Sequence, residues 1–219
     1  MSLTKELYDR FMGVDPATVG HHIQGGFMEP RMKPLNKNVK MLGTAYTVRM
    51  EGRDAAPLHA AFTKAPKGSV IVVDRCGDET YACVGEMVAL YAKCQGFAGL
   101  VIDGMVTDSR GLEQLDFPVF AKGVSVVVTK ILGVSGKLEI PVNCAGAVVH
   151  PGDLVFGDAD GVIVLPPDGY EEALAKAEAG IAREKKLRQH YLEGGKSHVN
   201  IQRLLDADLP AQIEKLRTY

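Results

Sequence analysis

Cysteine and aromatic residues are scarce in this chain, which narrows the chemistry that it can perform. Tryptophan is absent, aromatic residues make up 6% of the sequence, and the four cysteines are Cys76, Cys83, Cys94 and Cys144. No two of these cysteines form a Cys-x-x-Cys pair, so the sequence argues against a zinc ribbon or a thioredoxin-type redox site. The six histidines also lack the His-Glu-x-x-His spacing of zinc hydrolases.

The chain also has no long apolar run and no strong net charge. No uninterrupted apolar stretch approaches the roughly 18 residues that cross a bilayer, and residues 1–6 contain no apolar signal region. A formal net charge of −2 argues against general electrostatic binding to nucleic acid or to a membrane. We therefore expect a cytoplasmic protein that binds neither nucleic acid nor membranes.

The composition fits one globular domain with terminal extensions. The 219 residues are 46% hydrophobic and 24% charged, which is ordinary usage and predicts a sizeable core. No linker rich in Ser, Gly or Pro interrupts the sequence. We therefore treat residues 1–219 as a single domain, with helical extensions over about residues 1–30 and 168–219.

Residues 96–109 are the most informative stretch for both the fold and the site. The apolar run over residues 98–102 is bounded by turn signals and is typical of a buried strand. Gly104 lets the backbone turn, and Asp103 and Asp108 place two carboxylates near the end of that strand. Asp108 either caps the next helix or faces a ligand pocket at the carboxyl end of the strand, and the spacing leaves both open.

A strand–helix–strand unit is predicted for residues 70–103. The apolar run Val70–Asp74 precedes a helical pattern over Ala82–Gln95, and the second strand follows. Such a unit forms a right-handed crossover between parallel strands. Because the carboxyl ends of parallel strands share one edge of the sheet, we expect one crevice to receive the side chains of Asp74, Arg75, Asp103 and Asp108.

Further helices and strands are expected on both sides of this unit. A strand is predicted over Leu42–Met50, and helices over Leu3–Met12, Ala17–Gln24, Asp54–Lys64, about 168–192 and 198–217. After Pro118 the chain turns β-rich, with runs separated by Gly, Pro, Asn and Asp that indicate a sandwich-like or barrel-like region. These runs cover residues 119–121, 124–129, 138–142, 147–150, 154–157 and 162–165.

Several motifs together resemble the RraA-like family, which includes class II aldolases for 4-hydroxy-4-methyl-2-oxoglutarate and 4-carboxy-4-hydroxy-2-oxoadipate. The resemblance covers about residues 40–185 and is specific only as a combination of residues 68–74, 85–86, 96–108, 117–123, 151–158 and 160–164. It implies an α/β chain with a swivelling β/β/α fold, in which helices flank a central β-sandwich. It also implies assembly as a homotrimer or a hexamer.

The same resemblance implies a divalent metal, Mg²⁺ or Mn²⁺, in a cleft between subunits. Asp108 would be the direct ligand, and Glu86 and Glu184 would act through bound water. Mg²⁺ accepts one carboxylate with several waters, and it would stabilise the enolate left when the C–C bond of a 2-oxo acid breaks. The resemblance further implies that the amides of Gly85, Glu86, Met87 and Val88 would hold the carboxylate of pyruvate, which agrees with the preference of helix N-termini for anions.

One position departs from the family pattern. The active aldolases have an arginine directly before the metal-binding aspartate, and this chain has Thr107 there, which supplies no cation. Arg75 follows a predicted strand and either replaces the missing charge or forms only a surface salt bridge. Weaker candidates for the same role are Arg49, Arg53 and Lys122.

Two functions follow from the resemblance. The first is a metal-dependent C–C lyase acting on a small 2-oxo acid, by retro-aldol cleavage or oxaloacetate-type decarboxylation. Its catalytic residues would be Glu86, Asp108 and Arg75, and Thr107 and Arg75 would contact the substrate together with residues 85–88. The second is a non-catalytic regulator that binds the endoribonuclease RNase E or another protein, which a missing arginine would permit. The retained Asp108 and Glu86 favour the lyase.

Overall fold

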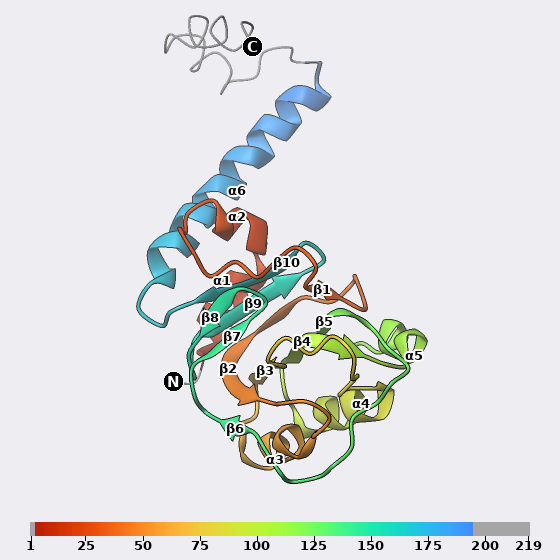
Figure 1. The fold of residues 1–219 in the computed structure, drawn as a ribbon. Helices are drawn as coiled ribbons and strands as arrows, with labels where there is room; N and C mark the ends of the chain where they lie inside the picture. The colour runs from red at the N-terminus through yellow and green to blue at the C-terminus, as the bar shows by residue number, and fades with distance from the viewer. Residues whose placement is uncertain (1–2, 195–219) are drawn as a thin grey trace, which may run out of the picture. The chain divides into compact units, whose positions relative to one another are not determined.

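The computed structural model describes residues 3–194, in which one large mixed sheet dominates (Figure 1). The chain divides into two compact units, Met1–Glu178 and Ala179–Tyr219. The sheet lies in the first unit. The helix predicted over residues 198–217 lies outside the described residues.

The large sheet has eight strands, and its middle is parallel. In spatial order the strands are β1 (Lys33–Pro34), β5 (Val119–Val124), β4 (Gly99–Val106), β3 (Ser69–Asp74), β2 (Met41–Arg49), β9 (Leu154–Asp158) and β10 (Gly161–Leu165), with β6 (Lys137–Leu138) paired to β2. Strands β5, β4, β3 and β2 are parallel, and antiparallel strands flank them. The sheet is nearly closed, and the Lys33 Nζ on β1 donates to the Asp160 carbonyl beside β10. This mixed α/β fold with flanking helices confirms the predicted class.

Alternate side chains of the central strands fill two separate cores. On β3, Ile71 and Val73 enter one core, and Val70 and Val72 enter the other. The first core lies beneath helices α3 (Ala56–Lys64), α4 (Glu86–Gln95) and α5 (Ser109–Gln114), and the hairpin of β7 (Val142–Cys144) and β8 (Ala147–Val149) contributes to the second. Because both faces of β3 are covered, its sequence is a continuous apolar run rather than an alternating one.

Three more helices complete the described chain: α1 (Lys5–Met12), α2 (Pro16–Gly20) and α6 (Tyr170–Leu192). The Thr4 side chain caps α1 by accepting from the Leu7 N–H. Helix α2 is shorter than predicted. Over residues 3–194, no helix combines the length and apolarity that crossing a bilayer requires.

The strand–helix–strand prediction is confirmed, with two changes that matter for the site. Strands β3 and β4 pair in parallel with Asp74 opposite Asp103. Helix α4 begins at Glu86 rather than Ala82, because the backbone N–H of Ala82 donates to Val127 and that of Cys83 to Met105. Strand β4 continues past Asp103 to Val106.

The strand predicted over residues 124–129 is wrong, although its sequence is strongly apolar. In this segment β5 ends at Val124, and Val128 forms only an isolated bridge to Ala82. The side chains stay exposed, with Val126 at 93%. The strand predicted over residues 138–142 is replaced by the separate short strands β6 and β7.

Candidate functional site

An open pocket lies where the end of β4 meets the start of α4. Its volume is about 550 Å³, within the range that small-molecule sites occupy. The pocket is lined by Glu86, Thr107, Asp108, Ser109, Arg110, Gly111, Val124, Ser125 and Val126. It therefore contains Asp108 and Glu86, two of the three carboxylates that the sequence analysis assigned to a metal.

Asp108 occupies a backbone conformation that non-glycine residues seldom adopt. Its φ and ψ are 56° and 42°, in the left-handed region, at the junction between β4 and α5. It sits at the N-cap position of α5, but its side chain makes no capping hydrogen bond. Side chains held in such a conformation cluster at functional sites. The simple capping role that the sequence left open is therefore not the role of this carboxylate.

The Asp108 carboxylate points instead at the N-terminus of α4. Its Oδ2 accepts the backbone N–H of Glu86 at 3.1 Å. The Thr107 Oγ1 donates to its Oδ1 at 3.4 Å, and the Thr107 N–H is held by the Val84 carbonyl at 2.8 Å. No lysine or arginine of the described chain forms an ion pair with Asp108 or with Glu86. Both carboxylates therefore remain available to a cation in the pocket.

Two glycines make room for these carboxylates. A Cβ atom on Gly85 would lie 2.3 Å from Oδ2 of Asp108, and one on Gly111 would lie 2.3 Å from Oε2 of Glu86. Real Cβ atoms do not approach other atoms so closely, so a Cβ at either glycine would force the acidic side chain to shift. Neither glycine has a positive φ. The close approach of the two carboxylates, rather than the backbone conformation, therefore accounts for glycine at positions 85 and 111.

The start of α4 also presents free backbone donors. Gly85 is its N-cap, and the N–H groups of Met87 and Val88 donate to no described residue. Such amides and the helix dipole favour an anion. The Met87 side chain is 71% exposed.

The prediction that Arg75 faces this pocket is not supported by its position. The Arg75 side chain is fully buried, pairs with Asp78 at 2.7 Å and donates to the Gly52 carbonyl at 2.6 Å. Gly104 on β4 leaves room for it, since a Cβ there would lie 2.8 Å from Cγ of Arg75. Strand β4 thus covers Arg75, and its guanidinium joins the Gly52 carbonyl to the Asp78 side chain.

The expected single crevice was also wrong. Asp74 and Asp103 line a second pocket, together with Arg49, Cys76, Gly77, Lys122, Pro141, Val142, Asn143 and Gly146. There Lys122 Nζ lies 2.5 Å from Asp103 Oδ1 and 3.0 Å from Glu29 Oε1. Because β4 continues for three residues beyond Asp103, Asp108 emerges at a different place.

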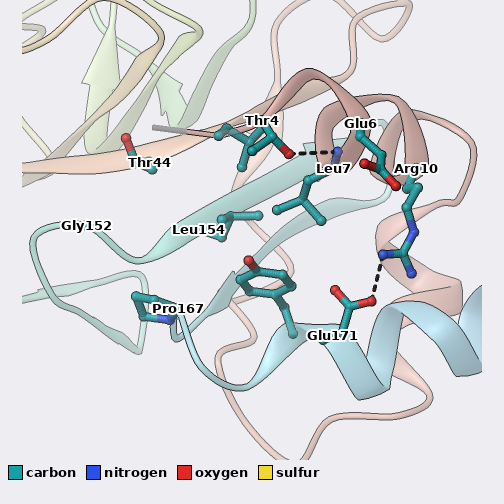
Figure 2. A pocket seen from close by; sticks show the side chains of 11 residues that line it. Thr4, Glu6, Leu7, Arg10, Thr44, Gly152, Leu154, Pro167 and Glu171 are labelled. Atoms are coloured by element: carbon teal, nitrogen blue, oxygen red, sulfur yellow. Dashed lines mark hydrogen bonds and ion pairs between the residues drawn. The ribbon is translucent and has the colours of Figure 1, made fainter. Parts of the chain in front are cut away.

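A third cavity, of about 290 Å³, lies between α1, β9 and the start of α6 (Figure 2). Its wall combines apolar side chains, such as Leu7 and Leu154, with polar ones, such as Thr44 and Glu6. Its cation, Arg10, is bound to Glu171 at 2.6 Å and to Glu178 at 2.9 Å. Arg10 and Glu171 are paired with each other, which leaves Glu6 as a carboxylate of this wall without an ion pair in the described chain. The Asp108 pocket combines two such carboxylates with free N–H groups at a helix start, so it is the candidate active site.

Comparisons with known proteins support the fold and the family that the sequence motifs indicated. A family model described as RraA-like (Aldolase/RraA) matches residues 4–164. The chain belongs to the RraA-like family. Its structure is similar to that of Streptomyces coelicolor RraAS2, described as an unusual member of the RNase ES inhibitor RraA family. That match has a TM-score of 0.74 and 27% identity, covering 86% of this chain and 98% of the other.

Two further RraA-like relatives carry different descriptions. A Halalkalibacterium halodurans protein named "Putative 4-hydroxy-4-methyl-2-oxoglutarate aldolase" is 41% identical over 146 residues, covering 67% of this chain and 69% of that protein. A Thermus thermophilus structure described as the RNA-processing inhibitor RraA has a TM-score of 0.59 and 26% identity, covering 66% of this chain and 88% of the other. Proteins similar to this chain are therefore named both as a putative aldolase and as an RNA-processing inhibitor.

Two residues of this RraA-like chain remain to be placed. Glu184 lies on α6 within the second compact unit, and its contact with a metal across subunits stays a prediction. Arg110 lines the pocket and was missed by the sequence analysis, although it lies only two positions after Asp108. The signal that could have indicated Arg110 is its position in the first turn of a helix that starts at Ser109, directly after Asp108.

Proposed function

We propose that this protein is a divalent-metal-dependent C–C lyase that acts on a small 2-oxo acid in the Asp108 pocket. The observation that carries the proposal is the arrangement of Asp108 and Glu86, two carboxylates with no cationic partner in the described chain, at the start of α4. Structural carboxylates near a surface are usually paired, capped or solvated without a shaped pocket. Here Gly85 and Gly111 leave the space that each carboxylate fills.

The donor set fits Mg²⁺ or Mn²⁺. Carboxylate oxygens are the ligands that these hard cations prefer, and Mg²⁺ retains several waters when few protein ligands are offered. In residues 3–194 no group of three or more His, Cys, Asp and Glu side chains is arranged to hold a metal. Asp108 would bind the ion directly, with Glu86 holding one of its waters. When bound, such an ion polarises the 2-oxo group of the substrate.

The start of α4 would bind the carboxylate of the substrate. The free N–H groups of Met87 and Val88 are aligned with the helix dipole, and together they favour an anion next to the site of the cation. A 2-oxo acid carries its carboxylate directly beside the carbonyl group. Binding through these amides would therefore bring the carbonyl oxygen toward Asp108.

Glu86 is placed to move a proton during cleavage. In retro-aldol cleavage, the hydroxyl group at C4 loses its proton and the C3–C4 bond breaks. The bonding electrons stay on C3 as the enolate of pyruvate, which is then protonated. The exposed Glu86 carboxylate, over Gly111, would accept the hydroxyl proton through a water and return it to C3. In decarboxylation the leaving group is CO₂, and only the final protonation is needed.

The test is pyruvate formation from a panel of 2-oxo acids with Mg²⁺ or Mn²⁺, followed by coupled reduction with lactate dehydrogenase. The panel includes oxaloacetate and 4-hydroxy-4-methyl-2-oxoglutarate. We expect turnover that EDTA abolishes and that Asp108→Asn lowers by at least about 10³-fold. Asp116→Asn, which removes an exposed carboxylate just after α5, is the matched control and should be unaffected. No turnover of any substrate by the unaltered protein would refute the lyase.

A second candidate function, a non-catalytic regulator that binds RNase E or another protein, is favoured by one feature. Seven apolar side chains between residues 124 and 134 are exposed: Val124, Val126, Val127, Val128, Ile131, Leu132 and Val134. The first two of them line the pocket. An exposed apolar surface of this extent is typical of a protein interface. Metal-independent capture of an RNase E fragment, lost on Val126→Asp, would support this function. Capture that survives the substitution would count against that surface.

We also propose assembly as a homotrimer or hexamer, in which Glu184 of a neighbouring copy approaches the metal through water. Light scattering coupled to size-exclusion chromatography measures the mass of the assembly. If Glu184 acts across subunits, Glu184→Gln should weaken Mn²⁺ binding by several-fold without changing that mass. An unchanged affinity would remove Glu184 from the site.

A further inference from the structure

Arg110 is a cation in the Asp108 pocket that no neighbouring group neutralises. It lies in the first turn of α5, two residues after Asp108, and is exposed. Its side chain forms no ion pair and no hydrogen bond with any residue of the described chain. The other lining residues supply no positive charge, so within the described wall of this pocket Arg110 is the one basic side chain.

Other arginines and lysines considered for the site are committed elsewhere or face another pocket. Arg75 is buried against Asp78, and Lys122 lies between Asp103 and Glu29. Arg49 lines the second pocket and pairs with Glu51 at 3.3 Å. Arg53 donates to the Val128 carbonyl and lies over the ring of Tyr81. Among the described residues, Arg110 is therefore the side chain that can supply a positive charge to the Asp108 pocket.

Local stability does not explain an arginine at this position. The dipole of a helix disfavours a cation in its first turn, and α5 has no acidic residue there to offset the charge. Without an ion pair, Arg110 gains nothing from its neighbours in the fold. A long guanidinium without an ion pair, in a pocket that also holds two carboxylates, instead suits a group that meets an anion brought into the pocket.

We propose that Arg110 is a catalytic residue that contacts the substrate oxygen on which negative charge collects when the C–C bond breaks. This inference rests on the proposed lyase function. With Asp108 and Glu86 facing one divalent cation, the pocket is neutral without Arg110 and attractive to an anion with it. A guanidinium that interacts more strongly with the enolate than with the ketone lowers the barrier to cleavage, because it favours the transition state over the ground state.

The first experiment measures binding rather than turnover. Oxalate resembles the enolate of pyruvate because it carries negative charge on the oxygen that is a neutral ketone in pyruvate. In titration calorimetry with saturating Mg²⁺, Arg110→Gln should weaken oxalate binding by at least about 30-fold and pyruvate binding by less than about 5-fold. Arg110→Lys should retain part of the preference for oxalate. Lys93→Gln, which removes an exposed charge at the far end of α4, is the control.

The second experiment moves the charge within the pocket. The Thr107 side chain lines the same wall and lies beside Asp108, so an arginine at position 107 would enter the same space. We expect Arg110→Gln to lower kcat by roughly 10²–10³-fold with a smaller change in KM. The double variant Thr107→Arg/Arg110→Gln should recover at least about 10-fold of that loss, whereas a purely structural role of Arg110 would give no recovery.

The two experiments separate the failure of this inference from the failure of the lyase function. If oxalate binding depends on Arg110 but no 2-oxo acid is cleaved, Arg110 stands as an anion contact and the lyase is refuted. Turnover by the unaltered protein with equal oxalate affinity in the Arg110→Gln variant would overturn the role of Arg110 and leave the lyase intact. Equal weakening of oxalate and pyruvate would also overturn it, because Arg110 would then recognise only the shared carboxylate. If oxalate fails to bind the unaltered protein, the inference is wrong as well.

Discussion

The backbone N–H of Glu86 and the Oδ2 atom of Asp108 are joined by a hydrogen bond of 3.1 Å, which links the first residue of α4 to the residue before α5. These two residues are 22 positions apart, and strand β4 brings them together. One oxygen of Asp108 is thereby oriented by the backbone while its carboxylate still faces the pocket. This hydrogen bond holds Asp108 next to Glu86 in the candidate site, and the first two predictions test the role of Asp108.

Gly85→Ala should weaken Mn²⁺ binding by at least about 10-fold while leaving the fold intact. Its new Cβ would lie 2.3 Å from Asp108 Oδ2 and 3.0 Å from Thr107 Cγ2, so the carboxylate must move. Its φ of −121° is open to alanine, so backbone strain is not expected. Electron paramagnetic resonance of free Mn²⁺ measures the affinity. Gly25→Ala, where nothing lies within 4 Å, is the control and should bind normally.

Asp108→Gly should abolish metal binding and yet unfold no more easily than the unaltered protein. Glycine adopts the left-handed conformation found at this position without a Cβ penalty, which relieves roughly 1 kcal/mol of strain. Asp108→Ala removes the same carboxylate but keeps the strain. Urea denaturation should therefore rank the glycine variant above the alanine variant. The reverse order would mean that the strain is not stored at this residue.

Asp54 should make the loop over residues 131–135 sensitive to acid. Its carboxylate accepts backbone N–H groups from Ala56, Leu132, Gly133, Val134 and Ser135, and these hydrogen bonds hold its pKa well below the usual value. Because the folded-state pKa is lowered, the stabilisation is complete above the unfolded-state pKa and is lost as the pH falls toward the folded-state pKa.

Thermal unfolding as a function of pH tests this expectation for Asp54. Asp54→Asn should lower the Tm at pH 7 by several degrees and reduce the further fall in Tm below pH 4. Hydrogen exchange should show faster exchange at Leu132 and Val134 in the variant. An Asp116→Asn protein, altered at a solvated carboxylate, should keep the original acid dependence. Parallel acid curves for the Asp54→Asn variant and the original protein would contradict the assignment.

Lys122→Met should destabilise the protein by about 3 kcal/mol, because it leaves Asp103 buried without its cation. The Asp103 side chain is only 9% exposed, and Lys122 Nζ lies 2.5 Å from it. Chemical denaturation measures the free energy of unfolding. Adding Asp103→Asn should recover part of the loss, since a neutral amide is less costly to bury. Independent, additive losses would show that the two groups are not coupled.

The cysteines should divide into two reactive and two protected thiols. Cys76 and Cys94 are exposed, and Cys83 and Cys144 are buried. Burial raises the pKa of Cys83 to about 11 and that of Cys144 well above its usual value, so little thiolate forms at pH 8. The pKa of Cys76 is raised by desolvation too, but its exposed thiol is open to the reagent. With a thiol reagent at that pH, we expect two equivalents to react in the folded protein and all four after unfolding. Early reaction of Cys83 would show that the segment behind the pocket opens locally.

Periodicity predicted the central unit of the fold well and the exposed loops poorly. The continuous apolar runs of β3 and β4 with the helix between them could be recognised, since burial on both faces leaves a strong pattern. The run over residues 124–129 is also rich in valine. In the described chain it pairs beyond Val124 only through the isolated bridge of Val128 to Ala82, and it stays an exposed loop. Composition alone cannot distinguish a buried apolar run from one that a surface presents to a partner.

The sequence by itself determined the family, the parallel core and the two acidic residues of the candidate site, because these are encoded in local runs and short motifs. Only the tertiary structure decided which charges share a pocket. Three additional residues of β4 after Asp103 carry Asp108 to its own pocket, and the missing Cβ of Gly104 lets the strand cover Arg75. Arg110 lines the pocket, whereas Arg75 is buried elsewhere. The path of the backbone, and not the spacing of residues in the sequence, determines which side chains share a pocket.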